Sequence, residues 1–201
     1  MKLYQSPTSP FVRIALAAAM ELGMTDRIEL VAARAPGANL GDINPLDKIP
    51  TLITDDGETL IESRLICQYL DSLGGPRLYP ADPAARRAVL QMEAVVQGVM
   101  DAVVLRRQET RREDSEKSQW WIDRQMRKIE LGLAMIEDRL DGFTNNDTIV
   151  PIEVCCCLEF MDRLAPEIPG FDWRADHPQL ADWHETYRHT PAIAATRPDA
   201  G

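Results

Sequence analysis

The sequence predicts two domains of different class, an α/β domain at residues 1–78 and an all-α helical bundle at residues 84–201. In the first part, short β-forming runs flank a hairpin signal, Asp55-Asp56-Gly57-Glu58. Beyond Pro83, glycine and proline become scarce and apolar residues recur at helical spacing. We therefore expect a linker between the domains at residues 74–83, which are rich in glycine and proline.

The expected elements of the first domain alternate in type along the chain. They are a strand at 2–5, a helix at 10–22, a strand at 28–32, two strands at 51–54 and 59–61, and a helix at 64–72. The first helix has Pro10 in its first turn and Gly23 just past its end, which is the usual asymmetry of helix termini. The resulting order, β-α-β followed by β-β-α, is that of a thioredoxin-like domain.

The second domain is expected to consist of helices, the first at Ala84–Arg106. Its clearest pattern is an apolar stripe with alternating spacings of four and three, formed by Ile122, Met126, Ile129, Leu133, Ile136 and Leu140. A stripe of this kind packs against a core.

Composition and charge narrow the class of protein. The longest apolar run, Ile14 to Met20, is far shorter than the roughly 20 residues that cross a bilayer, and the first residues contain no apolar signal region. We therefore expect a cytoplasmic protein that does not enter a membrane. The formal charge of −10, from 22 basic and 32 acidic residues, would repel a phosphate backbone, so no nucleic-acid partner is expected.

The four cysteines do not form a pattern typical of disulfides or metal sites. Cys155, Cys156 and Cys157 are consecutive, Cys67 stands alone, and no pair has zinc-ligand spacing. His177, His184 and His189 are separated by seven and five residues, which places no two at i and i+4 of one helix. We expect the cysteines to be small core residues, and the sequence predicts no metal site.

Two short segments have the features of a surface that holds a peptide. In Lys48-Ile49-Pro50-Thr51-Leu52, the proline stands at the start of a strand, which leaves the backbone of Ile49 to pair with another molecule. Glu62-Ser63 ends one strand and opens a helix, so the Ser63 amide lies at a helix N-terminus, where carboxylates are attracted.

Together with the N-terminus, these segments resemble the glutathione S-transferase superfamily, whose members join a thioredoxin-like domain to a helical domain. The matching segments are Ser9-Pro10-Phe11-Val12-Arg13, Asn44-Pro45-Leu46-Asp47-Lys48-Ile49-Pro50-Thr51-Leu52, Leu60-Ile61-Glu62-Ser63 with Ile66 and Tyr69-Leu70, and His177-Pro178-Gln179-Leu180 with Trp183. The resemblance implies a homodimer that uses glutathione as co-substrate and needs no cofactor. It also implies a helix through the centre of the second domain at Thr148 to Leu158, which Thr148 would cap through its hydroxyl and in which Pro151 is tolerated in the first turn.

The resemblance also implies a role for individual residues. The Ser9 hydroxyl would donate a hydrogen bond to the glutathione sulfur. The alternatives are the Ser6 hydroxyl or a site made of backbone groups alone. The tetrad Ser9-Pro10-Phe11-Val12 contains no cysteine, which disfavours the cysteine-type branch of the family. Around the peptide, the Ile49 backbone before Pro50 would pair with the cysteinyl unit. Lys48, and Arg13 or Arg34, would attract its negative charge, while Glu62 and Ser63 would hold the γ-glutamyl ammonium and carboxylate.

A second substrate is expected near four residues of both domains, namely Phe11, Met100, Val104 and Trp120. The expected function is a glutathione transferase of the bacterial serine type, which conjugates the glutathione thiolate to a small hydrophobic electrophile in detoxification. Two alternatives stay open. One is glutathione-dependent disulfide reduction, and the other is a non-catalytic interaction module.

Overall fold

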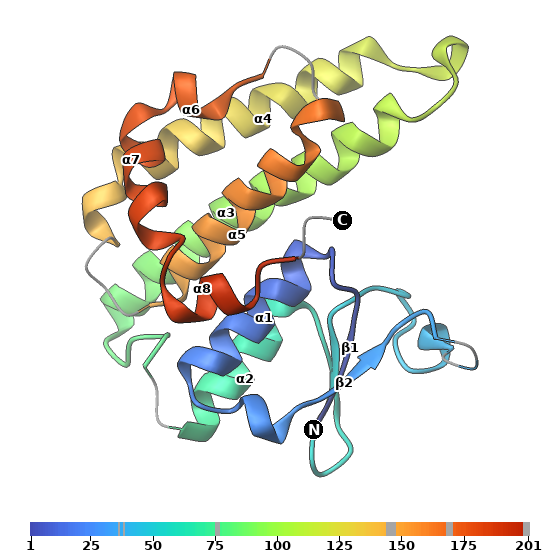
Figure 1. The fold of residues 1–201 in the computed structure, drawn as a ribbon, viewed down its shortest axis with the longest axis vertical. Coiled ribbons are helices and arrows are strands. Elements are labelled where there is room, and N and C mark those ends of the chain that lie inside the picture. The colour runs from blue at the N-terminus through green and yellow to red at the C-terminus, as the bar shows by residue number, and fades with distance from the viewer. Residues whose placement is uncertain (36, 38, 75–76, 144–147, 168–170, 199–201) are drawn as a thin grey trace. The chain divides into compact units, whose positions relative to one another are not determined.

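The computed structural model describes the chain except residues 36, 38, 75–76, 144–147, 168–170 and 199–201. The described residues form two compact units (Figure 1). One unit contains Met1–Ala81 and the chain from Thr190 on, and the other contains Asp82–His189. The first is α/β and the second is all helical, which confirms the predicted fold class.

The first unit is built on a four-stranded mixed sheet in the order β2-β1-β3-β4. Its elements are β1 (Lys2–Gln5), α1 (Pro10–Glu21), η1 (Thr25–Arg27), β2 (Glu29–Ala32), η2 (Leu40–Asp42), β3 (Thr51–Ile53), β4 (Thr59–Ile61), α2 (Ser63–Gly74) and α8 (Pro191–Ala195). β1 and β2 are parallel, whereas β3 is antiparallel to both β1 and β4. Helices α1 and α2 lie side by side on one side of the sheet (Figure 1).

Local sequence explains where α1 begins and ends. The Ser9 side chain caps its N-terminus, Pro10 occupies the first turn, and Gly23 follows its end with φ of +66°, a conformation that glycine adopts readily. The apolar face of the helix, from Val12 to Ala19, is buried.

The C-terminal segment belongs to the first unit, whereas the sequence assigned it to the helical domain. Helix α8 packs on α1, and the Arg13 guanidinium donates a hydrogen bond of 3.0 Å to the Ile193 carbonyl. Arg13 is buried, with 3% of its surface exposed. The Arg13 guanidinium thus joins the C-terminal segment to α1, and the expectation that its charge attracts an anionic substrate stays a prediction.

The second unit is formed by five helices and three short 3₁₀ turns among the residues described. They are α3 (Pro83–Thr110), η3 (Asp114–Glu116), α4 (Gln119–Asp138), η4 (Leu140–Gly142), α5 (Ile149–Leu164), η5 (Ala165–Glu167), α6 (Trp173–Asp176) and α7 (Pro178–Tyr187). Helix α3 packs against α4 and α5, and α7 packs against α5 and α4 (Figure 1). At Gly132 of α4, an added Cβ would lie 2.2 Å from Val99 Cγ2 of α3, so α3 and α4 approach closely there.

Helix α5 is the central helix of this unit, and almost all of its residues are buried. The predicted stripe of α4 contributes four buried residues to the same core, Ile122, Ile129, Leu133 and Ile136. Thr148 is the N-cap residue of α5, but its hydroxyl makes no capping hydrogen bond, which corrects the expected role of that hydroxyl.

By length and composition alone, α3 could cross a membrane. The sequence pattern did not reveal this because charged residues interrupt its apolar run. Half of the most apolar window of α3 is buried within the protein, as is common for a core helix.

Candidate functional site

Four chain segments meet at one edge of the sheet because of the strand register. Tyr4 pairs with Thr51, and Thr51 pairs with Ile61, so the segments after β1, before β3 and after β4 lie at the same end. The parallel strand β2 ends beside Gln5, which adds the segment after Ala32. This edge thus collects the predicted site residues from Ser9, Ile49 and Glu62-Ser63.

Ser9 stands directly before α1 and has an extended backbone conformation. Its Oγ accepts a hydrogen bond of 3.3 Å from the Val12 amide. A serine hydroxyl is one donor as well as an acceptor, so capping α1 occupies the oxygen and leaves the proton for another acceptor. The cap and the proposed activating role are therefore compatible in one side chain.

The segment before β3 is held in place by the buried side chain of Asn44. Its amide nitrogen donates to the Lys48 carbonyl and to Thr51 Oγ1, both at 2.9 Å, and its Oδ1 accepts from the Leu46 amide at 3.0 Å. Thr51 Oγ1 also donates to the Lys48 carbonyl at 2.8 Å. This network fixes the backbone on both sides of Ile49.

The Ile49-Pro50 peptide bond is cis, and the sheet pairing of β3 begins one residue later, at Thr51. The main chain of Ile49 therefore lies outside the β-ladder. The pairing of Ile49 with an extended ligand stays a prediction.

At the end of β4, Glu62 has φ of +82° and Ser63 opens α2. A positive φ is rare for a residue other than glycine and is concentrated at functional sites. Glu62 Oε2 accepts from the Arg64 amide at 3.2 Å, so this exposed carboxylate lies over the first turn of α2. The Ser63 residue itself is buried, with 1% of its surface exposed.

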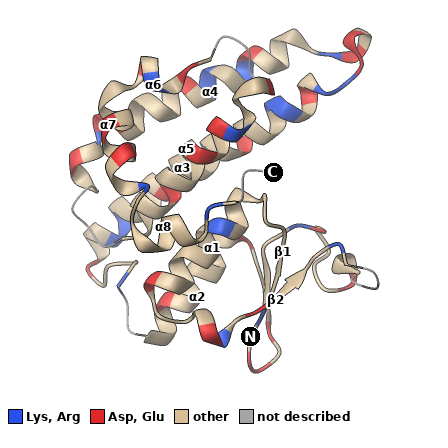
Figure 2. Cartoon of the chain, in the orientation of Figure 1, with Lys and Arg blue, Asp and Glu red and all other residues tan. Residues whose placement is uncertain are grey.

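A cavity of about 220 Å³ opens at this edge of the sheet. It is lined by Ser6, Ala33, Arg34, Leu40, Asp47 and Ile49. Ser6 thus borders the same cavity as Ile49, so its hydroxyl remains the alternative to Ser9 for activating the glutathione thiol. The groups here that attract an anion are the N-termini of α1 and α2 and the exposed Arg34 and Lys48, while the exposed carboxylates of Asp47 and Glu62 favour a cationic group of a ligand. Figure 2 shows basic and acidic positions interspersed over the helices of both units.

Comparison with known proteins identifies the family. The family described as glutathione S-transferase, N-terminal domain, matches residues 8–73. An uncharacterised glutathione S-transferase-like protein of Escherichia coli K12, YibF, is 32% identical over 98% of this chain and 98% of its own length. This chain belongs to the glutathione S-transferase superfamily.

Solved structures of this superfamily are also similar over nearly the whole chain. A glutathione transferase family member from Pseudomonas fluorescens Pf-5, with bound glutathione, is 38% identical over 98% of both chains with a TM-score of 0.90. A structure of a Pf-5 family member with bound S-(propanoic acid)-glutathione is 36% identical with a TM-score of 0.87, over 98% of this chain and 99% of that one. A Methylobacillus flagellatus glutathione S-transferase with glutathione bound is 31% identical over 98% of both chains, with a TM-score of 0.89.

The residues expected to contact a second substrate of this transferase-family protein differ in exposure. Phe11 in α1 and Val104 in α3 are partly exposed, and Trp120 at the start of α4 is 66% exposed. Met100 is fully buried in α3 and presents no surface to a substrate in this conformation. The second-substrate site stays a prediction.

The sequence analysis assigned no role to Asn44, although its side chain holds the backbone on both sides of Ile49 in place. Asn44-Pro45 is a dipeptide that favours turns, and this was the available signal. The pattern could not show that the Asn44 side chain reaches forward to Lys48 and Thr51.

Proposed function

We propose that this protein is a serine-type glutathione transferase that conjugates glutathione to a small hydrophobic electrophile. The observation that carries the proposal is the Ser9 hydroxyl, which caps α1 at the sheet edge where Ile49 and Ser63 also lie. Glutathione and a glutathione conjugate in the related Pseudomonas structures support a site for this peptide.

The chemical task of Ser9 is to favour the thiolate of bound glutathione, because the thiolate is the nucleophile. A thiol with an unperturbed pKa of about 8.5 is only a few per cent ionised at neutral pH. A hydrogen bond to a charged group contributes about 1.5–3 kcal/mol, which corresponds to lowering the thiol pKa by about one to two units. The N-terminus of α1 acts in the same direction.

The remaining residues would orient the peptide. The Ile49 backbone would pair with the cysteinyl unit, Lys48 would approach the glycyl carboxylate, and Glu62 and Ser63 would hold the γ-glutamyl end. No prosthetic group enters this scheme, since the sulfur comes from glutathione. We further propose a cytoplasmic homodimer, for which sedimentation at micromolar concentration should give the mass of two chains.

The test is a glutathione titration followed by thiolate absorbance over a range of pH, together with transfer rates toward halide and epoxide substrates. Ser9→Ala should leave the glutathione Kd within a few-fold while raising the bound thiol pKa by about one to two units. The transfer rate near pH 6.5 should fall about ten-fold or more. Ser9→Thr, which keeps a hydroxyl, should restore much of both.

Two controls separate activation from helix capping. Ser118 caps α4 by accepting from the Trp121 amide at 3.3 Å, the same geometry as Ser9 with Val12. Ser118→Ala should therefore cost a similar stability, about 1 kcal/mol, without changing the thiol pKa. Ser6→Ala should have little effect, and loss of thiol activation in Ser6→Ala alone would assign the role to Ser6 instead.

The same assays distinguish the alternatives. Turnover of disulfides but not of halides or epoxides would favour glutathione-dependent disulfide reduction. Absence of binding at millimolar glutathione would contradict both enzyme proposals and favour an interaction module.

A further inference from the structure

One histidine in the helical unit is buried without a hydrogen bond to its ring. His184 of α7 has no exposed surface, and neither Nδ1 nor Nε2 has a hydrogen-bond partner among the residues the structure describes. Its ring packs edge-on against Trp173, with ring centroids 5.6 Å apart. Buried polar side-chain atoms usually have at least one hydrogen-bond partner, so two unpartnered nitrogens in one buried ring are unusual.

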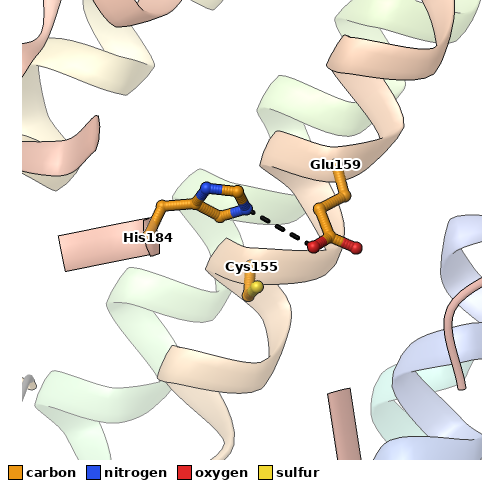
Figure 3. A group of neighbouring side chains, drawn as sticks. All are labelled: Cys155, Glu159 and His184. Atoms are coloured by element: carbon orange, nitrogen blue, oxygen red, sulfur yellow. Dashed lines mark ion pairs between the residues drawn. The ribbon is translucent and has the colours of Figure 1, made fainter. Parts of the chain in front are cut away.

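Two further potential ligands face the same ring from α5 (Figure 3). Cys155 and Glu159 are one helical turn apart, at i and i+4, and therefore project from the same face of α5. The cysteine sulfur, one Glu159 oxygen and one His184 nitrogen all lie within 4.8 Å of one another. Cys155 and His184 are buried, whereas Glu159 reaches the surface partially.

We propose that Cys155, Glu159 and His184 bind a zinc ion, with water in the fourth coordination position. Thiolate, imidazole and carboxylate are the three protein ligand types that Zn²⁺ uses. The sequence predicted no metal site because the spacing of the histidines and cysteines along the chain was uninformative. This site depends on the packing of α7 against α5, which brings residue 184 to residues 155 and 159.

The distances require only a modest closure of the three side chains. With Zn–N and Zn–O bonds of about 2.0–2.1 Å, tetrahedral ligand atoms lie about 3.3 Å apart, and His184 Nε2 is already 3.5 Å from Glu159 Oε1. With a Zn–S bond of about 2.3 Å, the sulfur must lie about 3.6 Å from the other two atoms. The present limit of 4.8 Å leaves roughly 1 Å to be closed by side-chain rotation.

The charges around the cluster are balanced when zinc is bound. Binding would release the Cys155 thiol proton to solvent, and the resulting thiolate and the Glu159 carboxylate neutralise Zn²⁺. Glu185 Oε1 lies 3.7 Å from His184 Nδ1, where a small movement would let it accept that N–H and direct Nε2 to the metal. Arg188 pairs with Glu185 at 3.0 Å and lies 3.8 Å from Glu159, so it offsets the second carboxylate.

The competing explanation is an ion pair between His184 and Glu159 with no metal. Cobalt(II) distinguishes the two, because it occupies zinc sites and a bound thiolate gives it an intense near-ultraviolet charge-transfer band. We expect tag-free protein, without glutathione present, to gain this band on titration with CoCl₂ and to lose it when ZnCl₂ is added. A wild-type protein that never gains the band would overturn the proposal.

Matched cysteine variants locate the ligand. Cys155→Ala should abolish the cobalt band, and His184→Gln should weaken cobalt binding by at least the 10–100-fold typical for loss of a partner that orients a ligand. Cys157→Ala, which removes a buried thiol two residues along the same helix, should leave the band intact. A band that survives in Cys155→Ala, or that disappears in Cys157→Ala, would overturn the assignment.

Thermal unfolding gives a second readout if a variant folds poorly. Zn²⁺ should raise the melting temperature of the wild type and of Cys157→Ala, because a ligand that binds the folded state stabilises it. The more conservative Cys155→Ser should show a much smaller shift. Equal shifts in Cys155→Ser and the wild type would contradict the site.

Discussion

Replacing Asn44 by alanine should damage both stability and glutathione binding, because this side chain holds the segment that carries Ile49. Asn44 is 1% exposed and makes three hydrogen bonds, to the Lys48 carbonyl, the Thr51 hydroxyl and the Leu46 amide. Alanine removes all three. The bond from the Thr51 hydroxyl to the Lys48 carbonyl remains, as does the backbone bond from the Asp47 amide to the carbonyl of residue 44.

The size of the effect follows from which groups lose their partners. Each hydrogen bond contributes about 0.5–1.5 kcal/mol net, so three lost bonds amount to about 1.5–4.5 kcal/mol. The Lys48 carbonyl still accepts from Thr51, so it does not become an unsatisfied buried atom, and Leu46 is an exposed residue. We therefore expect a loss of about 2–3 kcal/mol in the free energy of unfolding.

Urea unfolding and calorimetric titration with glutathione measure the two consequences. We expect Asn44→Ala to unfold at lower urea and to bind glutathione about ten-fold more weakly, the equivalent of about 1.4 kcal/mol. Asn39→Ala is a matched control, since Asn39 is exposed and its side chain makes no capping bond to η2. Wild-type stability and affinity in Asn44→Ala would refute the idea that this side chain positions Ile49.

Three further predictions concern other parts of the molecule. Glu62→Ala should weaken glutathione binding about ten-fold or more while changing stability by less than about 1 kcal/mol; equal losses in titration and urea unfolding would mean that Glu62 only supports α2. Gly132→Ala should destabilise by about 1–3 kcal/mol, because its Cβ would lie 2.2 Å from Val99 Cγ2, whereas Gly98→Ala, with open space around it, should stabilise by about 0.5–1 kcal/mol. Burial alone would raise the pKa of Glu137, but hydrogen bonds from His177 and the amides at the start of α7 outweigh it and lower that pKa below 4.5. The stability from Glu137 is thus present above pH 4.5 and lost as pH falls through the lower folded pKa, so the urea midpoints of Glu137→Gln and the wild type should converge on acidification.

Local signals predicted most of the α/β unit because its elements are bounded by residues with strong preferences. Ser9, Pro10 and Gly23 define the ends of α1, and the Asp-Gly hairpin places β3 and β4. Strand β2 begins one residue later than expected because Ile28 closes the 3₁₀ turn η1. The assignment of α8 could not be predicted, since it depends on a bond between Arg13 and Ile193, residues 180 positions apart.

For the site, sequence patterns indicated which residues carry chemistry but not how they are supported. Strand register brings Ser9, Ile49 and Glu62 to one edge, which the order of strands already implied. The roles of Asn44 and Arg13 depend on where long side chains reach. His184 lies 25 residues beyond Glu159 in the sequence, and only the packing of α7 on α5 brings the two together.

Because every cysteine is buried, the rate at which each thiol reacts with a reagent measures local unfolding of the helix that carries it. Cys67 lies in α2 of the first unit, and Cys155, Cys156 and Cys157 lie in α5 of the second, each with at most 1% of its surface exposed. A thiol-alkylating reagent can reach each position only after its helix opens, so labelling rates resolved by mass spectrometry report the opening of the two units separately. The same burial protects the folded chain from forming mixed disulfides with oxidised glutathione.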